Sequence, residues 1–373
     1  MNKPILIFPA GMPRALDYLQ KCLREGRDVI GASSLGYDPS REKYPTWMHL
    51  PYVTDPSFDE ALVQAVEEFN IGEIYTPNIV VWNHLSQTLG KLASRVVLAN
   101  ASPVDEALSG YRLALTRARY LAANQLPIAS EITPQTLPSD VEVAALSRYA
   151  DLIPGMCDDD KFHALLEIAR YSVKGDIVEI GSWWGKSAFI LARLARCFDI
   201  GKLLCVDPWA NEHLIQGEKM VDSGSAQVSA DEAFAVFQIG LLPFNANHIN
   251  YLRMPSVDGA KCYRDNRSVS TKDFGYTEYS GKISILHIDG NHVYEAAKAD
   301  VEAWKGFVVD GGWIVVDDYI WPYGDGPRKV GDELLEDNRS KISTAFVMGT
   351  ALFIQLASQS QQIDYEKLSK SCS

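Results

Sequence analysis

Five side chains that could do chemistry stand close together in the second half of this sequence. Asp289, Asn291 and His292 follow one short apolar run, and Asp317 and Asp318 follow the next. Carboxylate and amide oxygens in this number suit Mg²⁺, which typically keeps several waters as well. An imidazole with an unperturbed pKa near ~6.5 is partly neutral at working pH and can serve as a general base. These residue types therefore predict a site that moves a proton, with or without a divalent ion.

The two apolar runs, residues 284–289 and 313–317, are expected to be neighbouring strands of a mostly parallel sheet. In an open α/β sheet, ligands bind in the crevice outside the carboxyl ends of the strands. The five side chains are therefore expected to meet at that edge. His287 lies inside the first run and is expected to be a core residue with a satisfied hydrogen bond.

A third strand is expected over residues 176–180, followed at once by a glycine turn and the start of a helix. Ile177 and Val178 are β-branched, as is usual in short parallel strands that are buried on both faces. Gly181 and Gly185 lack Cβ, which lets the backbone turn sharply and approach a ligand. The stretch therefore predicts a strand, loop and helix unit beside the crevice.

The spacing of this turn indicates the ligand. Gly181 and Gly185 frame Ser-Trp-Trp, which fits neither the G-x-G-x-x-G turn of dinucleotide sites nor the phosphate-binding P-loop. An acid, Glu179, lies inside the strand, and the next expected strand, residues 202–206, is followed by Asp207. A carboxylate at that position can bind a ribose diol. A nucleoside with little phosphate is the predicted ligand.

These residues resemble a known family. Glu179-Ile-Gly-Ser-Trp-Trp-Gly185, followed by Val206-Asp-Pro208, is similar to motifs I and II of the class I S-adenosylmethionine-dependent methyltransferases. Residues 285–294, then Asp300, then residues 309–319 are similar to the small-molecule O-methyltransferases that include the macrocin-type sugar methyltransferases. The resemblance covers roughly residues 150–357. It implies a Rossmann-like α/β sheet of seven strands whose last strand is antiparallel.

The resemblance also implies roles for individual residues. S-adenosylmethionine would contact a set of residues around the first two motifs and the fourth strand, namely Glu179, Gly181, Ser182, Trp183, Gly185, Ser187, Asp207, Pro208, Trp209 and Asp289. A divalent ion such as Mg²⁺ would be held by Asp289, Asp317 and Asp318. The sequence departs from the sugar-methylating pattern at Asn291, where that pattern usually has Asp.

The catalytic residues expected for methyl transfer to a hydroxyl are His292 and Asp289. His292 is the first candidate for the base that takes the acceptor's proton. Asp289, or a metal ion that lowers the pKa of the alcohol, could replace it. As an alternative, His292 could be a helix N-cap or a hydrogen-bonded structural residue.

The first 125 residues are expected to form a smaller α/β domain of their own. Strands over residues 4–8, 28–32 and 73–77 alternate with helices over residues 15–23 and 58–69, which indicates a small parallel sheet. The segment resembles the N-terminal α/β domain that precedes the nucleotide-binding domains of ATP-grasp ligases. It could recognise the acceptor, or it could be a scaffold that dimerises or shields the active site.

The rest of the chain is expected to divide into a linker and helix over residues 126–150, the methyltransferase domain over residues 151–357, and a polar tail over residues 358–373. Residues 209–246 form an insertion after the ribose-binding strand, expected to be a lid, an acceptor-binding element, or an excursion packed elsewhere. Residues 256–259 and 264–275 are expected to be loops. Residues 344–348 and 351–355 are expected to form a closing hairpin.

Composition limits the partners and the location. A net charge of -13 argues against a nucleic-acid substrate and suits a small neutral or cationic acceptor. The six cysteines include no C-x-x-C pair, and no apolar run approaches the ~20 residues of a membrane span. A cytoplasmic protein with no membrane partner is therefore expected. The oligomeric state is left open, and a homo-oligomer is one of the alternatives.

The sequence therefore predicts a methyltransferase that transfers the methyl group of S-adenosylmethionine to a hydroxyl of a sugar or a biosynthetic natural-product intermediate. Two alternatives stay open: a nicotinamide-dependent oxidoreductase, and a non-catalytic module that binds the cofactor. The missing G-x-G-x-x-G turn and the closing hairpin both argue against the oxidoreductase.

Overall fold

The computed structural model describes residues 3–225 and 227–357, so the predicted polar tail lies outside the described residues. The chain divides into two compact units, Met1–Leu113 and Ala114–Ser373. The division falls inside one continuous helix, α4 (Pro103–Ala123), and not at residue 125 as the sequence suggested. Ala114, Ala118 and Leu121 on the second half of α4 are buried in the core of the second unit, which explains the difference.

The first unit is a parallel sheet with helices on both faces. Among the described residues its sheet has five strands in the order β3-β2-β1-β4-β5, and all four pairings are parallel. The strands are β1 (Ile5–Ile7), β2 (Val29–Ser33), β3 (Thr46–His49), β4 (Glu73–Tyr75) and β5 (Val97–Leu98). The helices are α1 (Pro13–Arg24), α2 (Phe58–Glu68), α3 (Ile79–Leu92) and the 3-10 turn η1 (Pro39–Lys43).

Two hydrophobic cores cover the two faces of this sheet. Helix α1 packs against one face, and α2 and α3 pack against the other. The small parallel sheet predicted from the alternation of elements is therefore confirmed. The resemblance of this unit to the ATP-grasp ligases stays a prediction.

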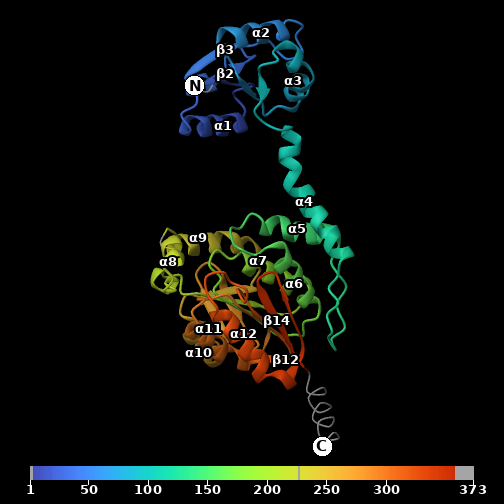
Figure 1. Ribbon diagram of the computed structural model, residues 1–373, viewed down its shortest axis with the longest axis vertical. Helices are drawn as coiled ribbons and strands as arrows, with labels where there is room; N and C mark the ends of the chain where they lie inside the picture. The colour runs from blue at the N-terminus through green and yellow to red at the C-terminus, as the bar shows by residue number, and fades with distance from the viewer. Residues whose placement is uncertain (1–2, 226, 358–373) are drawn as a thin grey trace, which may run out of the picture. The chain divides into compact units, whose positions relative to one another are not determined.

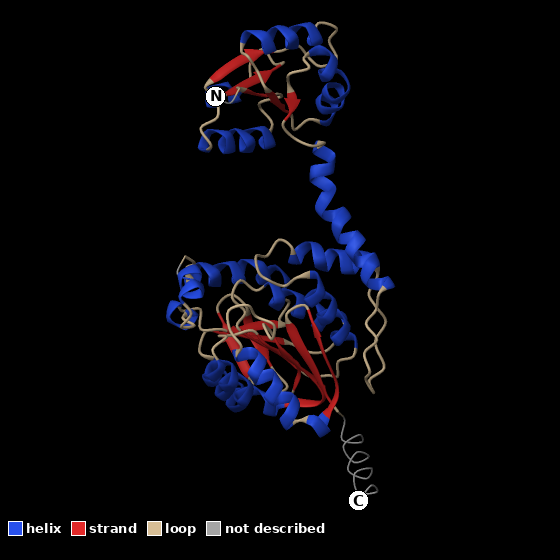
Figure 2. Ribbon diagram, viewed as in Figure 1, coloured by secondary structure: helices blue, strands red, loops and turns tan. Residues whose placement is uncertain are grey.

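The second unit is built on a larger sheet, drawn in red in Figure 2. Within the described part of the chain the sheet has seven strands in the order β13-β14-β12-β11-β6-β7-β8. Its strands are β6 (Asp176–Ile180), β7 (Leu203–Val206), β8 (Ile249–Leu252), β11 (Ile283–Ile288), β12 (Val308–Val316), β13 (Ile342–Met348) and β14 (Ala351–Leu356). Strand β14 runs antiparallel to both of its neighbours, as predicted.

Helices cover both faces of this sheet in three layers (Figure 1). One face carries α5 (Asp140–Ala150), α6 (Asp159–Arg170), α7 (Lys186–Cys197) and α9 (Ala230–Leu241). The other carries α10 (Ser256–Asn266), α11 (Tyr294–Trp304) and α12 (Gly326–Asp337). The shorter elements are α8 (Lys219–Ser225), η2 (Asn211–Leu214), η3 (Leu242–Phe244), η4 (Lys305–Phe307) and η5 (Arg339–Lys341).

The segment after β8 was predicted wrongly as loops. Residues 256–266 form α10, and residues 268–278 contain a separate two-stranded antiparallel ladder, β9 (Ser268–Thr271) with β10 (Gly275–Glu278). The buried residues of α10 are Gly259, Ala260 and Tyr263, so two small residues provide most of its inner face. Such a helix has too little apolar contrast to be seen by periodicity.

The stretch expected to be a linker lies in the second unit. Ile128 and Leu137 pack against its core, and the backbone of Gln135 is hydrogen-bonded to Arg170 at the end of α6. Within residues 3–225 and 227–357, every helix is too short or too polar to span a bilayer.

Candidate active site

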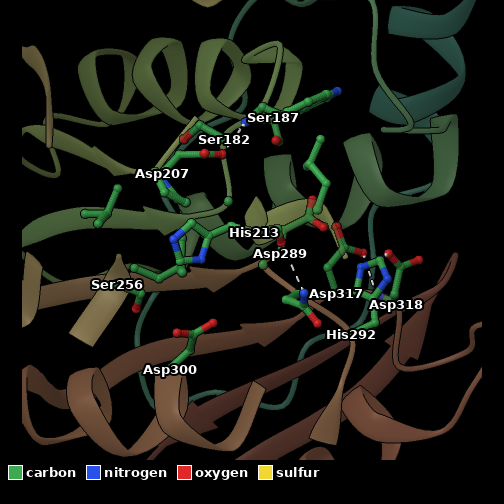
Figure 3. A pocket seen from close by; sticks show the side chains of 18 of the residues that line it. Ser182, Ser187, Asp207, His213, Ser256, Asp289, His292, Asp300, Asp317 and Asp318 are labelled. Atoms are coloured by element: carbon green, nitrogen blue, oxygen red, sulfur yellow. Dashed lines mark hydrogen bonds and ion pairs between the residues drawn. The ribbon is translucent and has the colours of Figure 1, made fainter. Parts of the chain in front are cut away.

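A cavity of about 750 Å³ opens at the carboxyl edge of the seven-stranded sheet. It is lined by the residues that follow β6, β7, β8, β11 and β12 and by part of the insertion. Figure 3 shows Asp207, Ser256 and Asp300 on one side of the cavity. His292, Asp317 and Asp318 lie on the opposite side. The predicted catalytic and cofactor-binding ends therefore face one cavity.

The glycines of the turn after β6 are required by contacts within the protein. Gly181 has a φ of 81°, and a Cβ there would lie 2.0 Å from the carbonyl oxygen of Asp289. Gly185 has a φ of 89°, and its Cβ would meet Leu241 and Phe237 of α9 at 2.7 and 2.9 Å. The sequence predicted that these glycines make room for a ligand, but the space beside each is filled by the chain itself.

Asp207, after β7, ties two loops together. One carboxylate oxygen accepts the backbone N–H of Trp183 at 2.9 Å, and the other accepts that of Trp209 at 2.7 Å. Both tryptophans have positive φ, 43° and 40°, a strained backbone for bulky residues. Burial raises the pKa of Asp207 to about 6, although the two N–H donors oppose the shift. Lone pairs remain on both oxygens for a ligand in the cavity.

Most of the predicted cofactor contacts line the cavity, with two exceptions. The residues that do so are Gly181, Ser182, Trp183, Gly185, Ser187, Asp207, Pro208 and Asp289. Trp209 is 1% exposed, and its indole N–H donates to the carbonyl of Trp183 at 2.8 Å. Glu179 is fully buried and does not line the cavity. Both residues therefore support the loops around the cavity.

The side chain of Glu179 lies beside that of His287 because of strand register. Glu179 on β6 is paired with His287 on β11, and the two side chains meet with Nδ1 of His287 3.1 Å from Oε1 of Glu179. The other carboxylate oxygen accepts the hydroxyl of Ser182 at 2.6 Å. His287 is thus buried in the core as expected, but only its Nδ1 has a partner: among the described residues its Nε2 has no hydrogen bond and lies 3.6 Å from Oδ2 of Asp317.

The side of the cavity that carries Asp207 also contains Ser256 and Asp300. The indole N–H of Trp304 donates to the hydroxyl oxygen of Ser256 at 2.9 Å. Asp300 is 9% exposed, and burial raises its pKa to about 6. Asp300 was part of the family resemblance, whereas Ser256 lies on α10, which the sequence did not predict.

His292 and Asp318 form a pair on the opposite side. Nε2 of His292 lies 3.0 Å from Oδ2 of Asp318, and the imidazole ring packs edge-on against Trp321 at a centroid distance of 4.3 Å. Among the described residues, Nδ1 of His292 has no hydrogen-bond partner. Asp318 has a φ of 50°, and its N–H donates to a carboxylate oxygen of Asp317. The ring is therefore oriented by an acid, as in nucleophile and base pairs of many enzymes.

Lys161 is a further residue of this site that the sequence did not identify. It follows the N-cap of α6, where the carboxylate of Asp158 accepts the N–H of Lys161 at 2.7 Å. Its side chain is 5% exposed, and its ammonium contacts the carboxylate of Asp317 and lies 3.4 Å from that of Asp289. Burial alone would lower the pKa of Lys161, but the carboxylates, Asp289 first, raise it above its ordinary value.

The predicted metal ligands do not come together as one set. Among the described residues, ligand atoms within 4.8 Å of one another occur as His287 with Asp289 and Asp317, and as Asp289 with His292 and Asp318. Asp317 is 4% exposed and already contacts an ammonium. The donor set Asp289, Asp317 and Asp318 therefore does not fit a divalent ion in this arrangement, because a cation already neutralises two of its members.

Asn291, where the resembling pattern usually has Asp, anchors the insertion beside the cavity. Its amide group donates to the carbonyl oxygens of His213 at 3.2 Å and Ile215 at 2.9 Å, and its own oxygen accepts the N–H of Val293 at 2.9 Å. A carboxylate could not make the two donated bonds. The insertion, which supplies Glu212 and Gln216 to the lining, is therefore held over the cavity by an amide.

Asn291→Asp is expected to loosen this part of the insertion. Losing two hydrogen bonds worth ~0.5–1.5 kcal/mol each should speed hydrogen exchange of residues 211–216 by about 5- to 150-fold. Mass-spectrometric exchange measures this directly. Asn338→Asp, which removes a similar amide-to-carbonyl bond from the residue after α12 to Leu334, is the matched control and should leave the insertion unchanged. Equal exchange in Asn291→Asp and the unmodified protein would show that the anchor has no effect.

Comparison with known proteins agrees with this geometry. Residues 178–319 match the family described as a methyltransferase domain, a match that spans less than half of the chain. No curated protein matches the chain in sequence.

Three solved structures are similar at low identity. The O-methyltransferase NovP is 16% identical with a TM-score of 0.37, over 68% of this chain and 100% of that chain. CalS11, a calicheamicin methyltransferase, is 14% identical with a TM-score of 0.39, over 69% and 94%. MycE, in complex with Mg and SAH, is 15% identical with a TM-score of 0.35, over 69% and 61%. At these TM-scores the structures decide neither the acceptor nor the metal of this chain.

The family match and the cavity coincide. The matched residues include the turn after β6, Asp207 after β7, and the acids after β11 and β12. Residues 178–319 therefore form a methyltransferase domain.

Proposed function

We propose that the chain methylates a hydroxyl group of a small molecule, with S-adenosylmethionine as the methyl donor. One observation carries the proposal. A single cavity has Asp207, next to the glycine turn, on one side and the His292–Asp318 pair on the other, with Asp289 between them. Methyl transfer needs a site for the nucleoside donor and a base for the acceptor's proton in the same cavity, and Asp207 and His292 would provide them.

The donor side suits a sulfonium nucleoside better than a dinucleotide. Its lining is rich in acids, among them Asp207, Asp289 and Asp300, and a positive sulfonium is favoured near them. The glycines of a dinucleotide turn let the backbone approach a pyrophosphate. Here the space beside Gly181 and Gly185 is occupied by backbone and by α9 side chains. This supports S-adenosylmethionine over NAD.

On the acceptor side, His292 is the base in this proposal. With its Nε2 proton donated to Asp318, the ring carries a lone pair on Nδ1. Among the described residues Nδ1 is buried and has no hydrogen-bond partner, so in this proposal the side chains around the ring move apart before the acceptor reaches it. Asp289 is a weaker base. Burial would raise the pKa of Asp289, but Lys161, followed by the two histidines, lowers it below its ordinary value.

The donor, when bound, would supply a methyl group attached to a positively charged sulfur. As the carbon–oxygen bond to the acceptor forms, the carbon–sulfur bond breaks, and the sulfur leaves as a neutral thioether. His292 takes the hydroxyl proton in the same step and becomes imidazolium, so charge is conserved. Asp318 stabilises that imidazolium at 3.0 Å. Positioning carries much of the rate in such a step.

The acceptor class in this proposal is a sugar or a natural-product intermediate, neutral or cationic, because the cavity lining is acidic. Metal assistance through Asp289, Asp317 and Asp318 stays a prediction of the sequence, and the contact between Lys161 and Asp317 argues against it.

Calorimetry tests the donor first. S-adenosylmethionine or its demethylated product should bind with a micromolar dissociation constant, and NAD should not bind. Binding of NAD alone would end the proposal. Next, a metabolite extract is incubated with protein and donor carrying a labelled methyl group, and mass spectrometry looks for labelled products. Donor binding without any labelled product, from extracts of several kinds, would favour the non-catalytic module.

A further inference from the structure

Lys161 lies at the acceptor end of the cavity and has no part in the proton transfer described above. Its ammonium contacts Asp317 on one side and Asp289 on the other, so it joins the strand ends of β11 and β12. A buried charge is costly unless it is paired. The side chains of Lys161 and Asp317 are 5% and 3% exposed, so water screens the charges of this pair only weakly.

We propose that Lys161 is the resident cation of the acceptor site and takes the place of a divalent ion between Asp289 and Asp317. A second cation in the same space would be repelled strongly, because like charges a few ångströms apart are poorly screened inside a protein. The two carboxylates then have no need of a metal for charge balance.

The lysine also provides a hydrogen-bond donor to the acceptor. An ammonium group has three N–H donors, and Asp317 and Asp289 account for two of them. Lys161 lines the cavity, so the third can reach an acceptor oxygen placed between Asp289 and His292. A donor at that oxygen favours the alkoxide character that develops as the base removes the proton. This part of the inference rests on the proposed function, whereas the exclusion of a metal does not.

Two features of the sequence place the ammonium there. The N-cap Asp158 fixes the first turn of α6 by accepting the N–H of Lys161. The following residues of α6, from Phe162 to Ala169, are all buried, so the helix lies flat against the core and cannot turn the lysine out to solvent. The cation is thus fixed by the fold before any ligand binds.

The experiment is a Mn²⁺ titration followed by electron paramagnetic resonance. The unmodified protein is expected to bind Mn²⁺ no tighter than about 1 mM. Lys161→Met frees Asp289 and Asp317 and is expected to bind Mn²⁺ at least about tenfold tighter. Adding Asp317→Asn to that variant should abolish the gain. Lys186→Met, which removes another cavity lysine, is the matched control and should behave like the unmodified protein.

Tight Mn²⁺ binding by the unmodified protein would overturn the inference. This holds whichever substitution, Asp317→Asn or Asp318→Asn, then removes the Mn²⁺ binding. Equal weak binding by the unmodified protein and Lys161→Met would overturn it as well. If Lys161→Met does not fold, Lys161→Gln replaces it, and the titration of the unmodified protein still decides against the inference if binding is tight. Calorimetry of S-adenosylmethionine on the same samples separates failure of the proposed function from failure of this inference.

Discussion

His292→Ala is expected to lower kcat for methyl transfer by about 10²- to 10⁴-fold, the usual contribution of a general base. The affinity for S-adenosylmethionine should stay within about threefold, because His292 lies across the cavity from Asp207, where the nucleoside is proposed to bind. Turnover is measured with labelled donor and the acceptor found in the metabolite screen, and affinity by calorimetry.

Two further measurements separate a base from a structural residue. Added imidazole should restore part of the activity of His292→Ala, because the vacated space beside Trp321 can admit it. Asp318→Asn keeps the ring but replaces the charged oxygen 3.0 Å from Nε2, and should also lower kcat, because the acceptor that holds the Nε2–H tautomer is lost. His248→Asn, a histidine outside the cavity lining, is the control. If His292→Ala turned over within threefold of the unmodified protein, His292 would not be the base, and another residue would have that role.

Gly181→Ala is expected to destabilise the second unit by about 2–5 kcal/mol and to abolish cofactor binding. A side chain at positive φ costs ~1–2 kcal/mol, and an overpacked contact costs a further ~1–3 kcal/mol. The new Cβ would lie 2.0 Å from the carbonyl oxygen of Asp289 and 2.5 Å from its carbonyl carbon. Both are backbone atoms just after β11, the strand paired with β6. The two loops must therefore separate, and Asp289 and Ser182 move with them.

Urea unfolding measures the loss of stability, and calorimetry measures the loss of binding. Gly217→Ala is the matched control, because Gly217 has a similar φ of 76° and, among the described residues other than its two chain neighbours, none has an atom within 4 Å of the position that its Cβ would take. It should cost only the ~1–2 kcal/mol of the backbone conformation and leave binding intact. Equal stability losses in the two variants would show that contact with Asp289 contributes nothing.

Local pattern was enough to predict the framework of the site. The β-branched run ending at Ile180, the glycine at position 181 and the apolar helix after it appear in the structure as β6, a positive-φ turn and α7. The antiparallel last strand was predicted as well. Such elements repeat at periods of two or 3.6 residues, and short-range sequence carries that information.

Other elements could not be predicted locally. Helix α10 buries mostly small residues, so its face shows little apolar contrast. The sequence placed all of helix α4 in the first domain, residues 1–125. Its residues Ala114, Ala118 and Leu121 nevertheless lie in the core of the second unit. Core membership of such residues depends on which surface they meet, and no local window of sequence contains that surface.

The sequence by itself determined the sheet, the crevice at its carboxyl edge and the kinds of side chain gathered there. Only the tertiary structure decided what those side chains do. It turned Glu179 towards His287, used Asn291 to hold the insertion, and brought Lys161 to Asp317 across 156 positions of sequence. The physical reason is that charge pairing depends on distances set by the packing of helices on strands, whereas residue type and periodicity fix only the elements themselves.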